Sequence, residues 1–198
     1  MLIQLNPSDW ERTTPFKGWS INHVITHLHA SDRVAALALS EPEKLRAIVA
    51  QWLTPEEVIQ NGVISGLPTL GSGPELREQW HECLIELCKL LEDLEPSVRI
   101  PWYGPDMSAR MFTTARQMET WAHGQAIADE LGIERSEDDR IRNIVVLGVN
   151  TFGWSFTVRG MEVPEEPPAL RLTSPSGESW EYGSPDSDQV IRGMAHEF

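Results

Sequence analysis

The residues best suited to chemistry are Glu119 and His123, which are separated by four positions in the sequence METWAHGQ. On a helix this spacing places both side chains on one face, with Cβ atoms roughly 5–6 Å apart, which suits two ligands of a single metal ion. The ridge that they share adjoins apolar positions, so both groups should point into a helical bundle. A divalent cation would offset the cost of burying a carboxylate and an imidazole.

His27 is the candidate for a third ligand. Catalytic zinc sites take three protein ligands from His, Glu or Asp and keep one position for water or substrate. His27 lies one step from the apolar stripe of its own helix, and an antiparallel helix pair can bring it opposite His123. Two alternatives stay open: His23 and His27 are also four apart and form a competing pair, and Glu119 could simply hydrogen-bond to His123 without a metal.

Other catalytic templates are absent. The chain has no HExxH, CxxC, GxGxxG, GxSxG or P-loop motif. Cys83 and Cys88 are five apart, about 140° around a helix, so we expect two reduced core thiols in a cytoplasmic protein. Of the remaining histidines, His29 points away from His27 and is expected to be solvated, and His81 is expected at the surface.

The amino-acid composition indicates which classes of binding partner to expect. The 198 residues include 16 Lys and Arg against 30 Asp and Glu, a formal net charge of −14. Nucleic-acid binding depends on basic residues that displace counterions, and anionic membranes attract basic segments, so neither partner is expected. The most apolar run, 144–156, is too short to span a bilayer. A small molecule is the expected partner.

Hydrophobic periodicity predicts a mainly α protein. Helices are expected over 20–39, 43–53, 74–94, 108–131 and 137–156, with a long loop over 61–74. Ser20 is the expected N-cap of the first long helix and Gly132 the stop of the third. The apolar stripe of the third helix is expected to follow Met111, Ala115, Met118 and Ala122.

The character of the chain changes after residue 160. Three prolines form a linker, and strands are expected over 169–173 and 178–182 around a turn at 175–177. An amphipathic stretch follows over 189–198. We therefore expect a metal-binding helical bundle over 1–135 and a partial C-terminal domain over 136–198, consisting of a helix and a β-hairpin.

Two motifs carry a family resemblance. The run Pro15–Ser20 (PFKGWS), followed by His27-Leu28 and Asp32, and the segment METWAHGQ at 118–125 together resemble the mycothiol-dependent maleylpyruvate isomerase type of metal-binding domain, in an uncharacterised branch. That domain belongs to the DinB-like superfamily of up-down helical bundles. His23 stands where relatives often carry an acidic residue, which predicts weaker capping of the first long helix.

The resemblance implies a site and an activity. It implies a divalent metal, usually zinc, held by His27, Glu119 and His123, and a low-molecular-weight thiol such as mycothiol as cosubstrate. It also implies thiol-dependent isomerisation or thiol transfer on a small electrophile, the alternative being a non-catalytic metal- or ligand-binding module. Relatives extend further at both ends, so we expect a chain truncated at both ends, and the apolar surface left by a missing helix would favour a homodimer.

Overall fold

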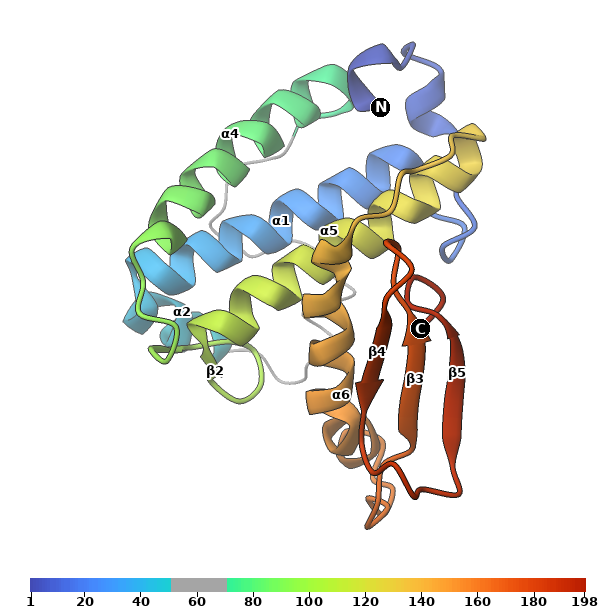
Figure 1. The fold of residues 1–198 in the computed structure, drawn as a ribbon. Coiled ribbons are helices and arrows are strands. Elements are labelled where there is room, and N and C mark those ends of the chain that lie inside the picture. The colour runs from blue at the N-terminus through green and yellow to red at the C-terminus, as the bar shows by residue number, and fades with distance from the viewer. Residues whose placement is uncertain (51–70) are drawn as a thin grey trace. The chain divides into compact units, whose positions relative to one another are not determined.

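The computed structural model describes residues 1–50 and 71–198, which form two compact units, Met1–Glu134 and Arg135–Phe198 (Figure 1). The first unit is helical, and among its described α-helices the one over Ile21–Ser40, labelled α1, contacts each of the others. Its elements are η1 (Leu2–Gln4), η2 (Asp9–Glu11), α1 (Ile21–Ser40), α2 (Pro42–Val49), α4 (Gly73–Glu92), β1 (Arg99–Ile100), β2 (Met107–Ser108) and α5 (Ala109–Leu131). The predicted mainly α fold is confirmed.

The start of α1 is held by a reciprocal cap. The Ser20 hydroxyl accepts a hydrogen bond from the His23 backbone N–H at 3.3 Å, and the His23 Nδ1 accepts one from the Ser20 N–H, also at 3.3 Å. The predicted N-cap is therefore confirmed, and His23 completes a capping box. The weaker capping expected from a histidine in place of an acidic residue stays a prediction. The imidazole nitrogen does what a glutamate carboxylate does in an ordinary capping box.

Two apolar clusters hold the helices together, and α1 contributes to both. The cluster around the first half of α1 contains Trp10, Ile21, Val24, Ile25, Leu28, Leu76 and Ile127. The cluster around its second half contains Val34, Ala35, Leu37, Ala38, Leu45, Leu87, Ile100, Ala109 and Phe112. Because helices pack around α1 on several sides, its buried surface is wider than a single stripe. His29 is consequently buried, with 5% of its surface exposed, and the prediction that it is solvated is wrong.

Helix α5 buries a different face from the one predicted. Its interior side chains include Phe112, Arg116, His123 and Ile127, whereas Ala122 is exposed. The predicted stripe followed the apolar residues, but part of the buried face is polar because it carries an arginine and a histidine. The predicted end is correct: Gly132 has a φ of 65°, a left-handed conformation that glycine adopts without steric cost.

The second unit combines one helix with a small sheet. A 3-10 turn, η3 (Asp139–Ile141), capped by Asp138, precedes α6 (Arg142–Thr157), so the helix begins later than predicted. Strands β3 (Ala169–Thr173) and β4 (Ser179–Tyr182) form the predicted antiparallel hairpin. The sequence reasoning did not predict a third strand, β5 (Val190–Met194), which pairs in parallel with β3 and completes the order β4-β3-β5.

Some sequence expectations fall outside the described residues. This applies to most of the loop expected over 61–74. The short second helix, α2, ends at Val49, four residues before its predicted end. Among residues 1–50 and 71–198, no helix combines the length and apolar character that a membrane crossing requires.

The cap at Ser20 can be tested by mutation. We expect Ser20→Ala to lower the free energy of unfolding by about 1 kcal/mol, because it leaves an N–H of the first turn without its acceptor. Urea unfolding followed by circular dichroism measures the change. Ser40→Ala is the matched control, since the Ser40 hydroxyl only donates to the Ala36 carbonyl at the exposed end of the same helix. Equal losses in the two variants would contradict the assigned role of Ser20.

Candidate metal centre

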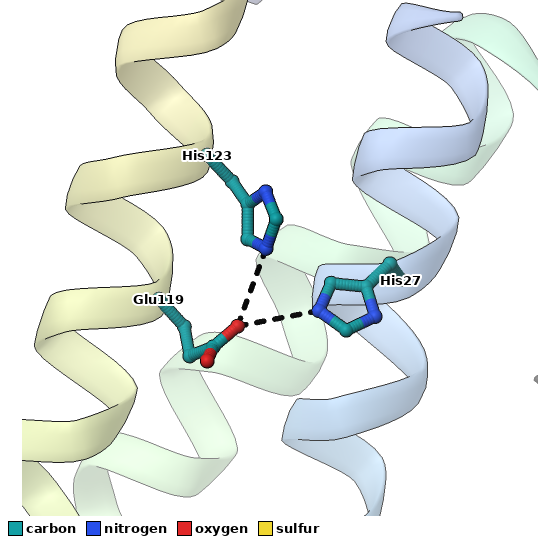
Figure 2. A group of neighbouring side chains, drawn as sticks. All are labelled: His27, Glu119 and His123. Carbon is teal, nitrogen blue, oxygen red and sulfur yellow. Dashed lines mark hydrogen bonds and ion pairs between the residues drawn. The ribbon is translucent and has the colours of Figure 1, made fainter. Parts of the chain in front are cut away.

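Figure 2 shows His27 of α1 facing Glu119 and His123 of α5. The Glu119 Oε2 lies 3.2 Å from the His27 Nε2 and 3.3 Å from the His123 Nε2. One potential ligand atom from each residue lies within 4.8 Å of the other two. In the described part of the chain, no other group of three or more His, Cys, Asp or Glu side chains converges in this way.

The helices meet here because two sequence features coincide. Glu119 and His123 share a face of α5 through their four-residue spacing, and the first half of α1 packs against α5 through the cluster that contains Leu28 and Ile127. His27, next to Leu28, is thereby brought to the carboxylate although 92 positions separate it from Glu119 in the sequence. The structure thus brings the three predicted residues together.

A tight turn before α1 supplies an aromatic wall. Lys17 and Gly18 both have positive φ, 53° and 69°, and the Trp19 N–H donates to the Phe16 carbonyl across the turn at 3.0 Å. The Phe16 ring packs edge-on against His123, with centroids 4.7 Å apart, and the Trp19 ring lies 5.4 Å from that of His27. The PFKGWS motif therefore lies beside the three-residue cluster.

The segment that carries this turn is tied to the end of α5. The Arg12 guanidinium donates to the Glu130 carboxylate at 3.0 Å and also to the Glu130 backbone carbonyl. A short antiparallel bridge between Thr13 and Ser20 closes the turn on itself. The aromatic wall is thereby held by both helices that provide the cluster.

Electrostatics favour an ionised carboxylate at the centre. Hydrogen bonds from His123 and then from His27 hold the pKa of the Glu119 carboxyl well below its usual range, against the opposing effect of burial. The His123 side chain is only 10% exposed, whereas those of His27 and Glu119 are 32% and 30% exposed. Solvent therefore reaches the cluster from the side of His27 and Glu119.

The donor set and spacing suit a zinc ion. Two imidazole nitrogens and one carboxylate oxygen form a known catalytic zinc ligand set. Ligand atoms bonded to tetrahedral zinc at about 2.0–2.2 Å lie roughly 3.3–3.6 Å from one another. The two nitrogen–oxygen separations, 3.2 and 3.3 Å, are close to that range.

The competing pair of His23 and His27 does not form a site. The His23 Nδ1 lies near both the Ser20 backbone nitrogen and the Ser20 hydroxyl, and His23 serves the helix cap. His29 is buried and burial lowers its pKa, while His81 is exposed as predicted. None of these three histidines belongs to the cluster.

Sequence reasoning missed a buried polar group close by along the same helices. The Arg116 Nε donates to the Asp32 Oδ1 at 2.9 Å, and the Trp80 Nε1 donates to the Asp32 Oδ2 at 2.8 Å. Asp32 had been singled out only as part of the family resemblance. The available signal for Arg116 was its position three residues before Glu119 and seven before His123, which places it on their face of α5.

Comparison with known families agrees with this arrangement. Residues 2–128 match the family model described as the mycothiol maleylpyruvate isomerase N-terminal domain. The chain belongs to this family. The match covers both motifs and all three residues of the cluster, so the resemblance predicted from the sequence is confirmed.

Two proteins of Mycobacterium tuberculosis, from strains CDC 1551 and H37Rv and each described as an uncharacterized protein, are similar to this chain. Each is 37% identical over 201 residues, covering 100% of this chain and 77% of the relative. Among solved structures, a mutant of the mycothiol-dependent maleylpyruvate isomerase matches with a TM-score of 0.59 at 18% identity, covering 98% of this chain and 78% of that one. This likeness establishes a shared fold.

Cys83 is half-buried and Cys88 is exposed, so the prediction that both are core thiols is wrong, and the two cysteines should differ in reactivity. Burial, together with the nearby charges of Asp32 and Glu86, raises the pKa of the Cys83 thiol to about 11. Because the thiolate is the nucleophile, we expect Cys83 to resist iodoacetamide at pH 8 and to react faster as the pH rises toward 11, whereas exposed Cys88 reacts at pH 8. Mass spectrometry of peptides from timed reactions measures both rates. Urea-unfolded protein is the control, and equal rates in the folded protein would contradict the burial of Cys83.

Proposed function

We propose that this protein binds one divalent metal ion, zinc, through His27, Glu119 and His123. We further propose that it uses this ion together with a low-molecular-weight thiol such as mycothiol. The reaction is either isomerisation of a small electrophile or transfer of the thiol to that electrophile. The convergence of two imidazoles and a carboxylate, in a chain that belongs to the maleylpyruvate isomerase N-terminal domain family, is the observation that supports this proposal.

Three protein ligands would leave a coordination position for an exogenous group. A zinc ion in such a site lowers the pKa of a bound thiol and holds the sulfur next to its target. The exposure of His27 and Glu119 supports an approach for small molecules from that side. The rings of Phe16 and Trp19 pack against those of His123 and His27.

The protein's own cysteines are poorly suited to supply the thiol. Cys83 lies on α4 with its pKa raised to about 11, so it stays protonated near neutral pH. Neither Cys83 nor Cys88 belongs to the converging group of ligand atoms. These observations support a thiol that arrives as a cosubstrate.

Metal content tests the first part of the proposal. We expect about one zinc per chain in protein purified without chelator or affinity metal, and loss of zinc in His27→Ala, Glu119→Gln and His123→Ala, because each removes a ligand. Inductively coupled plasma mass spectrometry measures the stoichiometry. His81→Ala, an exposed histidine of α4, is the matched control and should keep its zinc. Stoichiometric zinc in all three ligand variants, or no zinc in the wild type, would refute the site.

Thiol binding tests the second part. We expect mycothiol to add a near-ultraviolet absorption band to the cobalt-substituted protein and to alter its visible ligand-field bands, because sulfur would enter the coordination position that the protein leaves open. The variant Cys83→Ser/Cys88→Ser should give the same response, which assigns the sulfur to the added thiol. An unchanged spectrum at saturating mycothiol would favour the non-catalytic metal-binding module.

A further inference from the structure

A buried polar network joins three helices of the bundle. Asp32 of α1 is fully buried, at 0% exposure, and its two carboxylate oxygens accept separate hydrogen bonds. One comes from the Arg116 Nε of α5 at 2.9 Å, and the other comes from the Trp80 Nε1 of α4 at 2.8 Å. The carboxylate therefore connects α1 to α4 and α5 at a single point.

Stability alone is a weak explanation for this network. Removing a carboxylate and a guanidinium from water costs free energy that an ion pair often fails to return, and well-packed apolar residues commonly stabilise such a site as well or better. The Arg116 side chain is only 9% exposed, and its Nη2 is buried with no hydrogen-bond partner among the described residues. An incompletely satisfied ion pair points instead to a geometric role.

The network and the metal centre are neighbours along both helices. Asp32 lies five residues after His27, about 7.5 Å along α1. Arg116 lies three residues before Glu119 and seven before His123, about 4.5 and 10.5 Å along the same face of α5. The later residue of α1 contacts the earlier residue of α5, so the two helices are antiparallel. The two sets of contacts therefore follow one another along the interface between α1 and α5.

We propose that Asp32, Arg116 and Trp80 are positioning residues for the metal centre. They fix the register of α1 against α5, so that His27 meets the Glu119–His123 pair. Trp80 contributes by holding the second oxygen of Asp32 and thereby its orientation. This inference rests on the proposed zinc site. The three residues do not bind the ion themselves; they position its ligands by holding the helices that carry them.

Hydrogen bonds are directional, so the bonds to Asp32 can fix the position of α1 along α5. Apolar side chains tolerate small sliding because their contacts lack direction, whereas the Asp32 carboxylate has two donors fixed on two different helices. A shift of one helical turn, about 5.4 Å, would break both hydrogen bonds and separate His27 from Glu119. A smaller displacement would leave the bundle folded but would spread the zinc ligands.

The test compares zinc affinity with stability. In Asp32→Asn/Arg116→Met both charges are removed, so no unpaired charge stays buried, and the amide oxygen at position 32 can still accept from Trp80. We expect the zinc Kd of this variant to rise about 10–100-fold, the range typical when residues that orient metal ligands are lost. Trp80→Phe keeps an aromatic ring but loses the N–H donor, and we expect a smaller rise of several-fold.

Leu45→Ala is the matched control. Leu45 is a fully buried residue of α2, so its truncation destabilises the bundle without touching the network. Its zinc Kd should equal that of the wild type at a temperature where both proteins are folded. Chelator competition gives the Kd, circular dichroism melting gives the stability, and the cobalt ligand-field spectrum reports the coordination geometry, which should change in the network variants and not in the control.

The outcomes separate this inference from the function proposed above. A wild-type chain that binds no zinc overturns the metal site itself. A wild-type chain that binds zinc, with a folded double variant of unchanged Kd and cobalt spectrum, overturns the positioning role and leaves the site intact. If the double variant does not fold, Trp80→Phe decides the question, and wild-type affinity and spectrum in that variant overturn the inference.

Discussion

The antiparallel contact between α1 and α5 is the constraint on which the candidate centre depends. His27 and Glu119 lie 92 positions apart in the sequence, yet their side chains must converge to ligand spacing, and the 3.2 Å between the His27 Nε2 and the Glu119 Oε2 leaves little tolerance. Apolar clusters supply most of the driving force for packing, but they specify position only loosely. Directional contacts, such as the bonds to Asp32, are the features that can set a register.

The N-terminal segment shows how one short motif can serve both the fold and the site. Ser20 begins α1 and His23 completes its cap, so the helix that carries His27 starts at a defined residue. The turn at Lys17 and Gly18 places Phe16 against His123. The PFKGWS motif thus fixes the beginning of α1 and encloses one side of the cluster, which explains why the motif and the ligands occur together.

Local signals made much of the fold and the cluster predictable. The four-residue spacing of Glu119 and His123, the cap at Ser20 and the glycine at 132 depend on neighbouring residues and can be identified in the sequence. The burial of His29 on α1 and of Arg116 on α5 depends on which helices surround them, and periodicity does not contain that information. Strand β5 was missed for the same reason, because its pairing partner β3 begins 21 residues earlier and the pairing is parallel.

The shared fold and the proposed chemistry have different kinds of support. At 18% identity, the structural likeness to the maleylpyruvate isomerase establishes how the helices are arranged, and an arrangement of helices does not specify a reaction. Three ligand atoms within 4.8 Å of one another support the proposed zinc site. A thiol cosubstrate requires two further features: a coordination position left free, and cysteines unsuited to fill it. The exposure of His27 and Glu119 and the raised pKa of Cys83 bear on these two points. Cobalt spectroscopy with added mycothiol is therefore more informative about activity than any further comparison of folds.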